Sequence, residues 1–284
     1  MPGLMLKIKE SLKDMSLSER KVANYILNNT EEAVGLFIGE LAERCGTSKA
    51  SVIRMCRTLN YDGYREFALA LASDVASEKE DDGAYTDIRA GDDLETIIKN
   101  VCHNSKKSID DTYKVLNSKD VERAINIIHK ARRILFFGAG ASGLIALDAQ
   151  QKFIRINKCA WAYTDQHMQA TSAANLSKND VVVVISYSGE TADIIESVKI
   201  AKESGATIIS ITKYGNSTLS EISDINLFFS SPETMMRSGA MGSRIAQLTI
   251  IDIIFTGVAS LEYPYIKKYL DRTKLVTSKK RSKK

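Results

Sequence analysis

The chain has 284 residues, of which 44% are hydrophobic and 26% charged, a composition typical of a globular protein with about two domains. Its formal net charge is +4, and the five basic residues within 279–284 account for it, so the rest of the chain carries about −1. This distribution excludes a protein that is basic throughout, and any argument for nucleic-acid binding must rest on a local patch of charge.

Lys7, Lys9 and Glu10 lie where a secretory signal would have its apolar core, so we expect no such signal. The longest apolar run, Leu248–Ala259, is interrupted by Asp252 and is shorter than a membrane-spanning helix. We therefore expect a cytoplasmic protein with no membrane partner. The cysteines are far apart and form no C-x-x-C pair, which indicates free thiols and no metal site. They are Cys45, Cys56, Cys102 and Cys159.

Residues 1–77 carry apolar side chains at helical spacing and no convincing strand, which predicts a domain of short helices. The apolar positions form five stripes in chain order. They are Leu4, Ile8 and Leu12; Val22, Tyr25, Ile26 and Leu27; Ile38, Leu41, Ala42 and Cys45; Val52, Ile53, Cys56 and Leu59; and Phe67, Leu69 and Leu71.

The third and fourth stripes, over Ile38–Leu59, have the form of a helix-turn-helix. Gly46 permits the left-handed backbone of a sharp turn after the first helix. We predict that Thr47 caps the second helix, because its hydroxyl can accept a hydrogen bond from the first turn. The apolar stripe of the second helix then leaves five side chains facing outward. They are Ser48, Lys49, Ser51, Arg54 and Arg57.

Positive charge is concentrated on this second helix. Residues 1–77 contain ten basic and ten acidic residues, yet no acid lies between Glu43 and Asp62. Lysine and arginine can contact phosphates, and arginine can also bridge a guanine edge with two hydrogen bonds. We therefore predict a surface for double-stranded DNA, with Lys49, Ala50 and Ser51 nearest the bases. The predicted DNA-binding residues are Thr47, Ser48, Lys49, Ala50, Ser51, Arg54 and Arg57. The alternative is a helical hairpin with a solvated basic face that does not bind DNA.

Two stretches that flank the hairpin, Leu17–Ile26 and Arg57–Phe67, carry a family resemblance. With the hairpin between them, LSERKVANYI and RTLNYDGYREF resemble the N-terminal domain of RpiR-type (MurR/RpiR) bacterial transcriptional regulators. The resemblance implies that the domain recognises an operator.

Residues 78–93 are acidic and poor in apolar side chains, which is typical of a linker. Residues 94–272 are predicted to form an α/β domain, and the basic residues 273–284 a disordered tail. Long helices are expected at Leu94–Leu116 and Met241–Leu261, with another at Val121–Lys130. Five apolar runs that alternate with helical segments predict a doubly wound parallel sheet of about five strands, with helices on both faces. The runs are Ile134–Phe137, Ala160–Tyr163, Val181–Ile185, Thr207–Ile211 and Ile225–Phe229.

Two loops follow strands of this sheet and precede helices, which is where open α/β sheets bind ligands. The first, residues 138–143, matches G-x-G-x-x-G, and Asp165 follows the next strand, as in a dinucleotide-binding fingerprint. The second, residues 186–191, places Ser186, Ser188 and Thr191 around Gly189. Several hydroxyls on one turn can hydrogen-bond a phosphate, and helix N-termini favour an anion. An NAD(P) site is the alternative.

The two loops together are similar to those of the sugar isomerase (SIS) domain family, over about residues 94–265. The resemblance implies a flavodoxin-like sheet and a bound phosphosugar. It implies phosphate-binding roles for Ser142, Ser186, Ser188 and Thr191, and Gly140 and Gly189 would let the backbone approach the phosphate closely. Tyr187, in the same loop, is also a predicted ligand residue.

Candidates for the sugar end lie near the same edge of the sheet. His167, in the RpiR-like segment Asp165–Gln169, is a ligand contact or a surface histidine. Glu233 binds a sugar hydroxyl or caps a helix, and Arg237 and Arg244 flank the same edge.

Three functions are compatible with these features: a ligand-responsive transcription regulator, a phosphosugar isomerase with an added helical domain, and an NAD(P)-dependent enzyme. Isomerisation requires a base and an acid near neutral pH, and none of the three histidines lies in the last third of the chain. We therefore expect a regulator without enzymatic activity or cofactor, which represses sugar or amino-sugar catabolism genes and responds to a phosphosugar. A homodimer or homotetramer is expected, because two helix-turn-helix units read the half-sites of a near-palindromic operator.

Overall fold

The structure, a computed structural model, describes residues 4–78, 91–231 and 240–278. It divides into two compact units, a helical one over Met1–Thr86 and an α/β one over Asp87–Lys213 and Ser217–Lys284. Glu233 and Arg237 lie outside the described residues, as do residues 79–90 of the predicted linker and 279–284 of the predicted tail.

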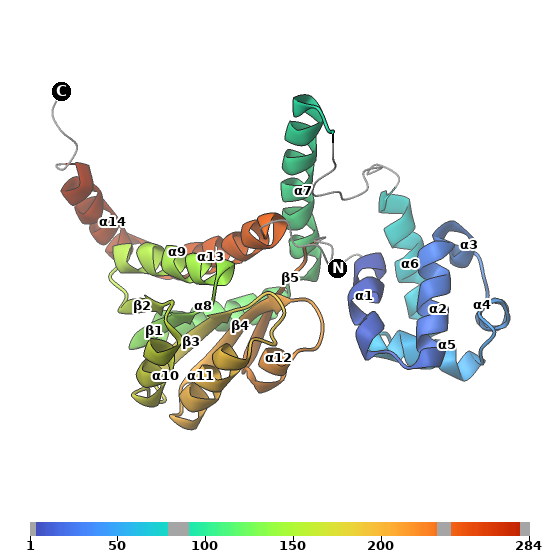
Figure 1. The fold of residues 1–284 in the computed structure, drawn as a ribbon, viewed down its shortest axis with the longest axis horizontal. Helices are drawn as coiled ribbons and strands as arrows, with labels where there is room; N and C mark the ends of the chain where they lie inside the picture. Colours follow the sequence, from blue (N-terminus) through green and yellow to red (C-terminus); the bar gives the residue numbers. More distant parts are fainter. Residues whose placement is uncertain (1–3, 79–90, 232–239, 279–284) are drawn as a thin grey trace. The chain divides into compact units, whose positions relative to one another are not determined.

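The helical unit contains six α-helices and one short 3₁₀ helix among its described residues (Figure 1). They are α1 (Leu4–Ser11), the 3₁₀ helix (Leu12–Asp14), α2 (Leu17–Asn28), α3 (Thr30–Val34), α4 (Ile38–Arg44), α5 (Lys49–Thr58) and α6 (Tyr64–Glu78). One apolar core unites them, and most of the predicted inward positions belong to it. Three assignments differ: Leu69 is 67% exposed, Ile53 is only half-buried, and Met55, which was not predicted, is fully buried.

The α/β unit begins with two helices and then alternates strands with helices. Its elements are α7 (Leu94–Val115), α8 (Ser118–Lys130), β1 (Arg133–Phe137), α9 (Ala141–Arg155), β2 (Ala160–Tyr163), α10 (Gln166–Ala174), β3 (Asp180–Ile185), α11 (Ala192–Glu203), β4 (Thr207–Lys213), α12 (Thr218–Ile222), β5 (Ile225–Phe229), α13 (Met241–Leu261) and α14 (Tyr263–Ser278).

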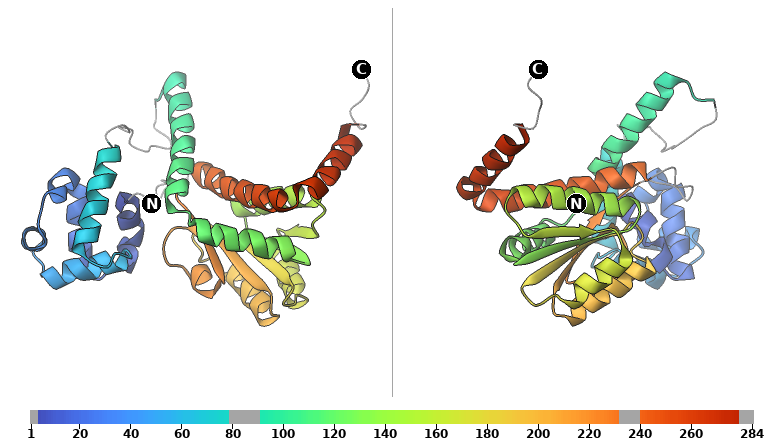
Figure 2. Two further views of the ribbon diagram at one scale, coloured as in Figure 1. Left: turned by 180° about the vertical axis from the view of Figure 1, so that it is seen from behind. Right: turned by 60° about the vertical axis from the view of Figure 1, so that its left-hand side comes forward.

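The five strands form one parallel sheet in the order β2-β1-β3-β4-β5, which confirms the predicted doubly wound, flavodoxin-like architecture. Alternate side chains of each strand enter different cores, because successive residues point to opposite faces. Phe136 and Val183 pack with α8, α9 and α13, whereas Phe137 and Val182 pack with α10, α11 and α12. Figures 1 and 2 show these two helical layers on either side of the sheet. The chain reverses direction across the sheet between β1 and β3, so the loops that follow these strands lie side by side.

Helix α13 is longer than the apolar run seen in the sequence. With 21 residues it has the predicted bounds, and by length and composition it is the one described helix that could cross a membrane. It packs on the sheet as a partly buried core helix, with Ala246, Ile250 and Ile254 almost fully covered.

Helix α14 was not predicted, and it extends to Ser278, beyond the point where a disordered tail was expected to begin. Ile266 is 2% exposed and Leu270 packs on the same core, so one face of the helix is held by apolar contacts. Pro264 is compatible with this helix because it lies in the first turn, where backbone N–H groups need no helical partner.

Helix α7 uses a polar face to contact its own unit. Asn104, Ser108 and Thr112 are buried, and the Thr112 hydroxyl donates to the Ser230 carbonyl at 3.1 Å. The apolar positions in the first half of the helix do not pack on the sheet. Their exposed fractions are 72% for Leu94, 46% for Ile97, 56% for Ile98 and 41% for Val101.

Candidate functional sites

The turn between α4 and α5 is fixed by backbone hydrogen bonds. Gly46 has φ +60° and donates to the Glu43 carbonyl at 3.0 Å, while Thr47 N–H donates to the Ala42 carbonyl at 2.9 Å. This pair of bonds is the Schellman end of α4. Thr47 therefore completes α4, and the predicted Thr47 cap of α5 was wrong.

Ser48 caps α5 instead. Its hydroxyl oxygen accepts the Ser51 N–H at 3.2 Å, and its backbone is extended, as the residue before a helix requires. Ser51 was expected to face outward, but it is only 4% exposed. The Ser51 hydroxyl lies 3.1 Å from Ser48 Oγ and accepts a hydrogen bond from Arg54 at 3.0 Å. Ser51 is thus a link inside the hairpin.

Arg54 also has an internal partner. Its guanidinium lies 3.8 Å from the carboxylate of Glu19, a residue that is 8% exposed and that accepts the Ser16 N–H at the start of α2. Arg44 pairs in the same way with Glu32 and donates to the Tyr25 hydroxyl. Because these arginines neutralise acids of their own unit, they stabilise the helical core as well as carrying charge.

Lys49, Ala50 and Arg57 are exposed on α5, as predicted for the outer face of the second helix. No described residue forms an ion pair with Lys49 or Arg57, which leaves both cations facing solvent. The stem of Lys49 crosses α4 at Gly39, where an added Cβ would lie 3.2 Å from Lys49 Cε.

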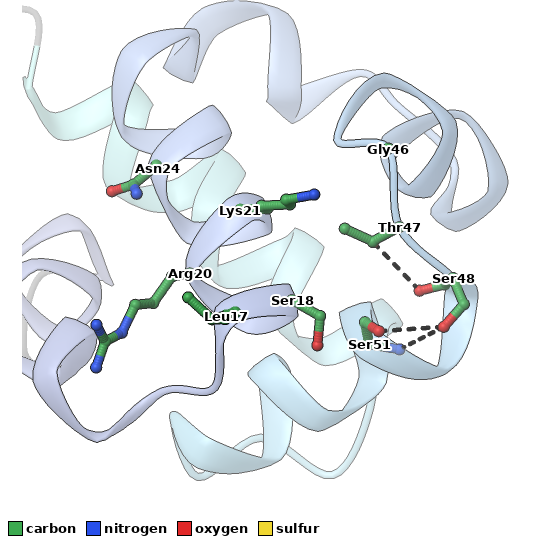
Figure 3. Close-up of a pocket in the computed structure, with 9 residues that line it drawn as sticks. All are labelled: Leu17, Ser18, Arg20, Lys21, Asn24, Gly46, Thr47, Ser48 and Ser51. Carbon is green, nitrogen blue, oxygen red and sulfur yellow. Dashed lines mark hydrogen bonds between the residues drawn. The ribbon is translucent and has the colours of Figure 1, made fainter.

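A groove runs between the first half of α2 and the α4–α5 turn (Figure 3). Its cavity volume is about 660 Å³, and its polar lining contains two cations and no acid. The lining residues are Leu17, Ser18, Arg20, Lys21, Asn24, Gly46, Thr47, Ser48 and Ser51.

In the α/β unit, the loops after β1 and β3 converge on one pocket of about 290 Å³. The pocket therefore lies at the carboxyl edge of the sheet, where the strand order reverses. Its lining joins five hydroxyl side chains, one of them the tyrosine, with four apolar ones and one glycine, and has no Asp, Glu, Lys, Arg or His among the described residues. The lining residues are Ala139, Gly140, Ala141, Ser142, Ile185, Ser186, Tyr187, Ser188, Thr191 and Ile194.

The first of these loops requires glycine at two positions. A Cβ on Gly138 would lie 2.6 Å from the Ser142 carbonyl oxygen, so only glycine allows the loop to fold so closely over the start of α9. Gly140 has φ +55°, a conformation that other residues rarely adopt. Asp165, which a dinucleotide site would use to bind ribose, accepts the Met168 N–H at 2.9 Å and caps α10.

The second loop is held by its own hydroxyls and by a distant carboxylate. Gly189, with φ +70°, donates to Ser186 Oγ at 3.1 Å, and Ser188 Oγ accepts the Glu190 N–H at 3.2 Å. The carboxylate of Glu190 accepts the N–H and hydroxyl of Thr218, at 2.8 and 2.7 Å, and so ties the loop to α12.

The hydroxyls of the pocket differ in how much of their bonding capacity the protein uses. Thr191 precedes α11 but makes no side-chain cap, so its hydroxyl is available to a ligand. Ser142 is 8% exposed, and the amide of Gln247 on α13 donates to its hydroxyl at 3.5 Å. Sequence reasoning missed Gln247, because only the packing of α13 against α9 brings the two residues together. It also missed Lys213, whose ammonium group lies 5.6 Å from the Tyr187 ring centroid.

Two predicted ligand residues are not among those that line the pocket. His167 is exposed in the first turn of α10. Gly189 is packed against Ser217 on the side of the loop away from the pocket lining, where an added Cβ would lie 2.2 Å from Ser217 Oγ. The predicted residues that the pocket does bring together are Gly140, Ser142, Ser186, Tyr187, Ser188 and Thr191.

The comparisons with known proteins agree with both halves of this structure. Residues 2–78 match the helix-turn-helix domain of the rpiR family, and residues 127–257 match the SIS domain. The chain is 45% identical to an HTH-type transcriptional regulator of Caldanaerobacter subterraneus subsp. tengcongensis, over 98% of each chain. It is 37% identical to the HTH-type transcriptional regulator HexR of Pseudomonas aeruginosa, over 91% of this chain and 90% of that one.

Among solved structures, the Vibrio vulnificus NanR protein complexed with ManNAc-6P is similar with a TM-score of 0.61. It is 28% identical, over 96% of this chain and 97% of that one. The sugar isomerase domain of an RpiR transcription factor from Sphaerobacter thermophilus shares the fold, with a TM-score of 0.58 and 16% identity, over 63% of this chain and 98% of that one.

A helix-turn-helix unit on a chain that also carries an SIS domain, with such relatives over its whole length, defines an HTH-type transcriptional regulator. The chain belongs to the RpiR family of HTH-type transcriptional regulators.

Proposed function

We propose that this regulator binds a near-palindromic operator through α5 and that a phosphosugar in the SIS pocket controls the binding. The observation that carries the proposal is the convergence of two loops on one uncharged pocket lined by Ser142, Ser186, Ser188 and Thr191. Hydroxyls and the backbone N–H groups at the start of α9 and α11 can hold a phosphate without a cation. The similarity to NanR, whose structure contains ManNAc-6P, supports a phosphorylated sugar or amino sugar as the ligand.

The proposed DNA-binding residues are the exposed ones of the hairpin: Ser48, Lys49, Ala50 and Arg57, with Thr47 at the turn. Arg54 contributes charge while it is held by Glu19. The regulator acts in the cytoplasm as a homodimer or homotetramer, and the exposed apolar face of α7 is the element we assign to self-association. His167 and Glu233 are kept as candidates for the sugar end of the ligand.

Control by ligand follows from thermodynamic coupling. If the phosphosugar and the operator favour different arrangements of the chain, each weakens the affinity for the other by the same factor. The coupling free energy is typically about 1–3 kcal/mol. We propose a repressor of sugar or amino-sugar catabolism genes that the phosphosugar releases from the operator. The SIS domain then acts as a sensor rather than as a catalyst, in keeping with relatives that are transcriptional regulators.

A thermal-shift experiment tests the ligand class. Trp161 is the one tryptophan of the chain and lies on β2, so its fluorescence follows the unfolding of the SIS unit alone. ManNAc-6P and fructose 6-phosphate would be compared with the unphosphorylated sugars and with NAD⁺. A ligand at a hundred times its Kd stabilises by about 2.7 kcal/mol, which raises Tm by roughly 5–10 °C in a domain of this size.

The test variant is Ser188→Ala, which removes one exposed hydroxyl from the pocket together with its hydrogen bond from the Glu190 N–H, and disturbs no apolar core contact. We expect its ligand-free Tm to fall by no more than a few degrees and most of the phosphosugar shift to be lost. A shift with NAD⁺ alone would support the dinucleotide alternative. Interconversion of aldose and ketose phosphates by the purified chain would refute the pure sensor.

A further inference from the structure

The groove in front of the helix-turn-helix contains groups that no structural role explains. Leu17, Lys21 and Asn24 lie one or two turns apart on α2, so they share a single face of that helix. This face is exposed, and it lies opposite the face that buries Val22 and Ile26. In Figure 3 the Lys21 side chain extends across the groove toward the turn at Gly46 and Thr47.

The electrostatics of the groove distinguish Lys21 from its neighbours. Arg54 is paired with Glu19, and Arg20 donates to the carbonyl oxygens of Met15 at 2.8 Å and Lys13 at 3.0 Å. Lys21 has no ion-pair or hydrogen-bond partner among the described residues. The hydroxyls of Thr47 and Ser48 lie across the groove from it and that of Ser18 one turn before it on α2, around a space that no acid lines. A cation beside three hydroxyls is suited to a phosphate oxygen, since both kinds of group donate hydrogen bonds to it.

We propose that this groove binds a phosphate of the DNA backbone, with Lys21 as its charge and Ser18 and Thr47 as its hydrogen-bond donors. The proposal rests on the proposed function, because it adds a contact from α2 to the DNA surface of α5. The turn that positions α5 forms one wall of the groove, so a phosphate held there fixes how the exposed side chains of α5 meet the bases. The contact contributes affinity and register, and it reads no sequence.

The test compares Lys21→Met, which keeps the stem and removes the charge, with Lys21→Arg, which keeps the charge. Lys9→Met is the matched control, because Lys9 is exposed on α1 outside the groove and its loss lowers the net charge equally. Two duplexes are used: one selected from a random library by the wild-type chain, and a scrambled sequence of the same composition. Fluorescence anisotropy measures Kd for each across a series of salt concentrations.

We expect Lys21→Met to weaken both duplexes by a similar factor, roughly tenfold, and to lower the salt slope by about one. Lys21→Arg should restore both values, and Lys9→Met should change Kd less than about twofold. Equal effects of Lys21→Met and Lys9→Met would overturn the groove assignment. So would a loss confined to the selected duplex, because that would make Lys21 a base contact.

The same measurements separate this inference from the proposed function. Arg57→Ala changes α5 and leaves the groove intact. If the wild-type chain selects no sequence from the random library, operator binding itself is refuted. If Arg57→Ala weakens binding and Lys21→Met does not, DNA binding stands and the groove assignment fails. Circular dichroism melting of each variant checks that the helical unit remains folded.

Discussion

Asp180 is the residue whose replacement should most clearly destabilise the sheet that carries the ligand pocket. Its carboxylate lies at the start of β3 and is fully buried. Arg132 and Arg133 each donate two hydrogen bonds to it, at 2.8–3.2 Å, and the backbone N–H and hydroxyl of Ser177 each donate one at 2.9 Å. The carboxylate therefore ties the first residues of β1 and β3 to the loop before β3.

The expected cost of Asp180→Ala follows from this geometry. Removing one partner of a buried ion pair costs about 3–5 kcal/mol. The lower end of this range applies here, because the side chain of Arg132 is 57% exposed and its guanidinium stays hydrated when Asp180 is removed. A loss of about 3 kcal/mol corresponds to a decrease in Tm of roughly 6–12 °C for a domain of this size. Trp161 fluorescence reports this change, because β2 pairs with β1.

The matched control is Asp148→Ala, which removes a carboxylate that pairs with Lys152 at 2.6 Å on the surface of α9. Lys152 keeps a second partner in Asp252, so the control should cost less than about 1 kcal/mol. Equal Tm decreases in the two variants would refute the reasoning, since they would show that the buried network around Asp180 adds nothing beyond a surface pair.

The same carboxylate makes stability depend on pH. Burial alone would raise the pKa of Asp180, but the hydrogen bonds from Arg133, Arg132 and Ser177 outweigh it and hold the pKa well below its usual range. A carboxyl whose pKa is lowered in the folded state stabilises the protein above its unfolded pKa of about 4, and this contribution is lost as the pH falls below that value. In Asp180→Asn, the part of the acid destabilisation that arises below about pH 4 should be smaller than in the wild type.

Three further predictions concern the two sites. Arg54→Ala should lower the stability of the helical unit by about 1–3 kcal/mol in circular dichroism melts, because it leaves the Glu19 carboxylate buried without its cation. Arg57→Ala should instead weaken DNA binding and leave the melting temperature unchanged. Gly189→Ala should destabilise the SIS unit more than Gly140→Ala, since both have positive φ but only the Cβ at 189 would clash, 2.2 Å from Ser217 Oγ. Glu190→Gln should weaken the phosphosugar thermal shift severalfold, because a neutral amide holds the Thr218 N–H less strongly and loosens the loop; an unchanged shift would show that α12 does not support the pocket.

Sequence patterns predicted the elements because periodicity depends only on neighbours along the chain. The five apolar runs became the five strands, with ends extended by no more than two residues, as at Thr207–Lys213. The pocket loops were predictable for the same reason, since a glycine-rich turn and a serine-rich turn each follow a strand directly. The unforeseen contacts join residues far apart in the sequence, such as Gln247 with Ser142 and Glu190 with Thr218. No local pattern specifies them.

The start of α5 shows how two local signals compete. Both Thr47 and Ser48 can cap a helix, and Thr47 was chosen from the sequence because it directly follows the turn glycine. The structure decides because Thr47 N–H is needed to end α4, so the next helix begins one residue later and Ser48 caps it. Ser51 lies four residues before the buried Met55, so it shares the inward face of α5, while Lys49 and Ala50 stay exposed.

Internal bonding then separates structural residues from those suited to meet a partner. Ser51 and Arg54 were grouped with Lys49 and Arg57 on sequence alone, yet their polar atoms bond within the helical unit. Buried polar groups need such partners, whereas an exposed cation without one remains able to bind a phosphate. By that criterion Lys21 belongs with Lys49 and Arg57, although it lies on a different helix and outside the acid-free stretch. A surface formed by three separate cations on two helices depends on the angle between α2 and α5, and their packing around Val22, Val52 and Cys56 sets that angle.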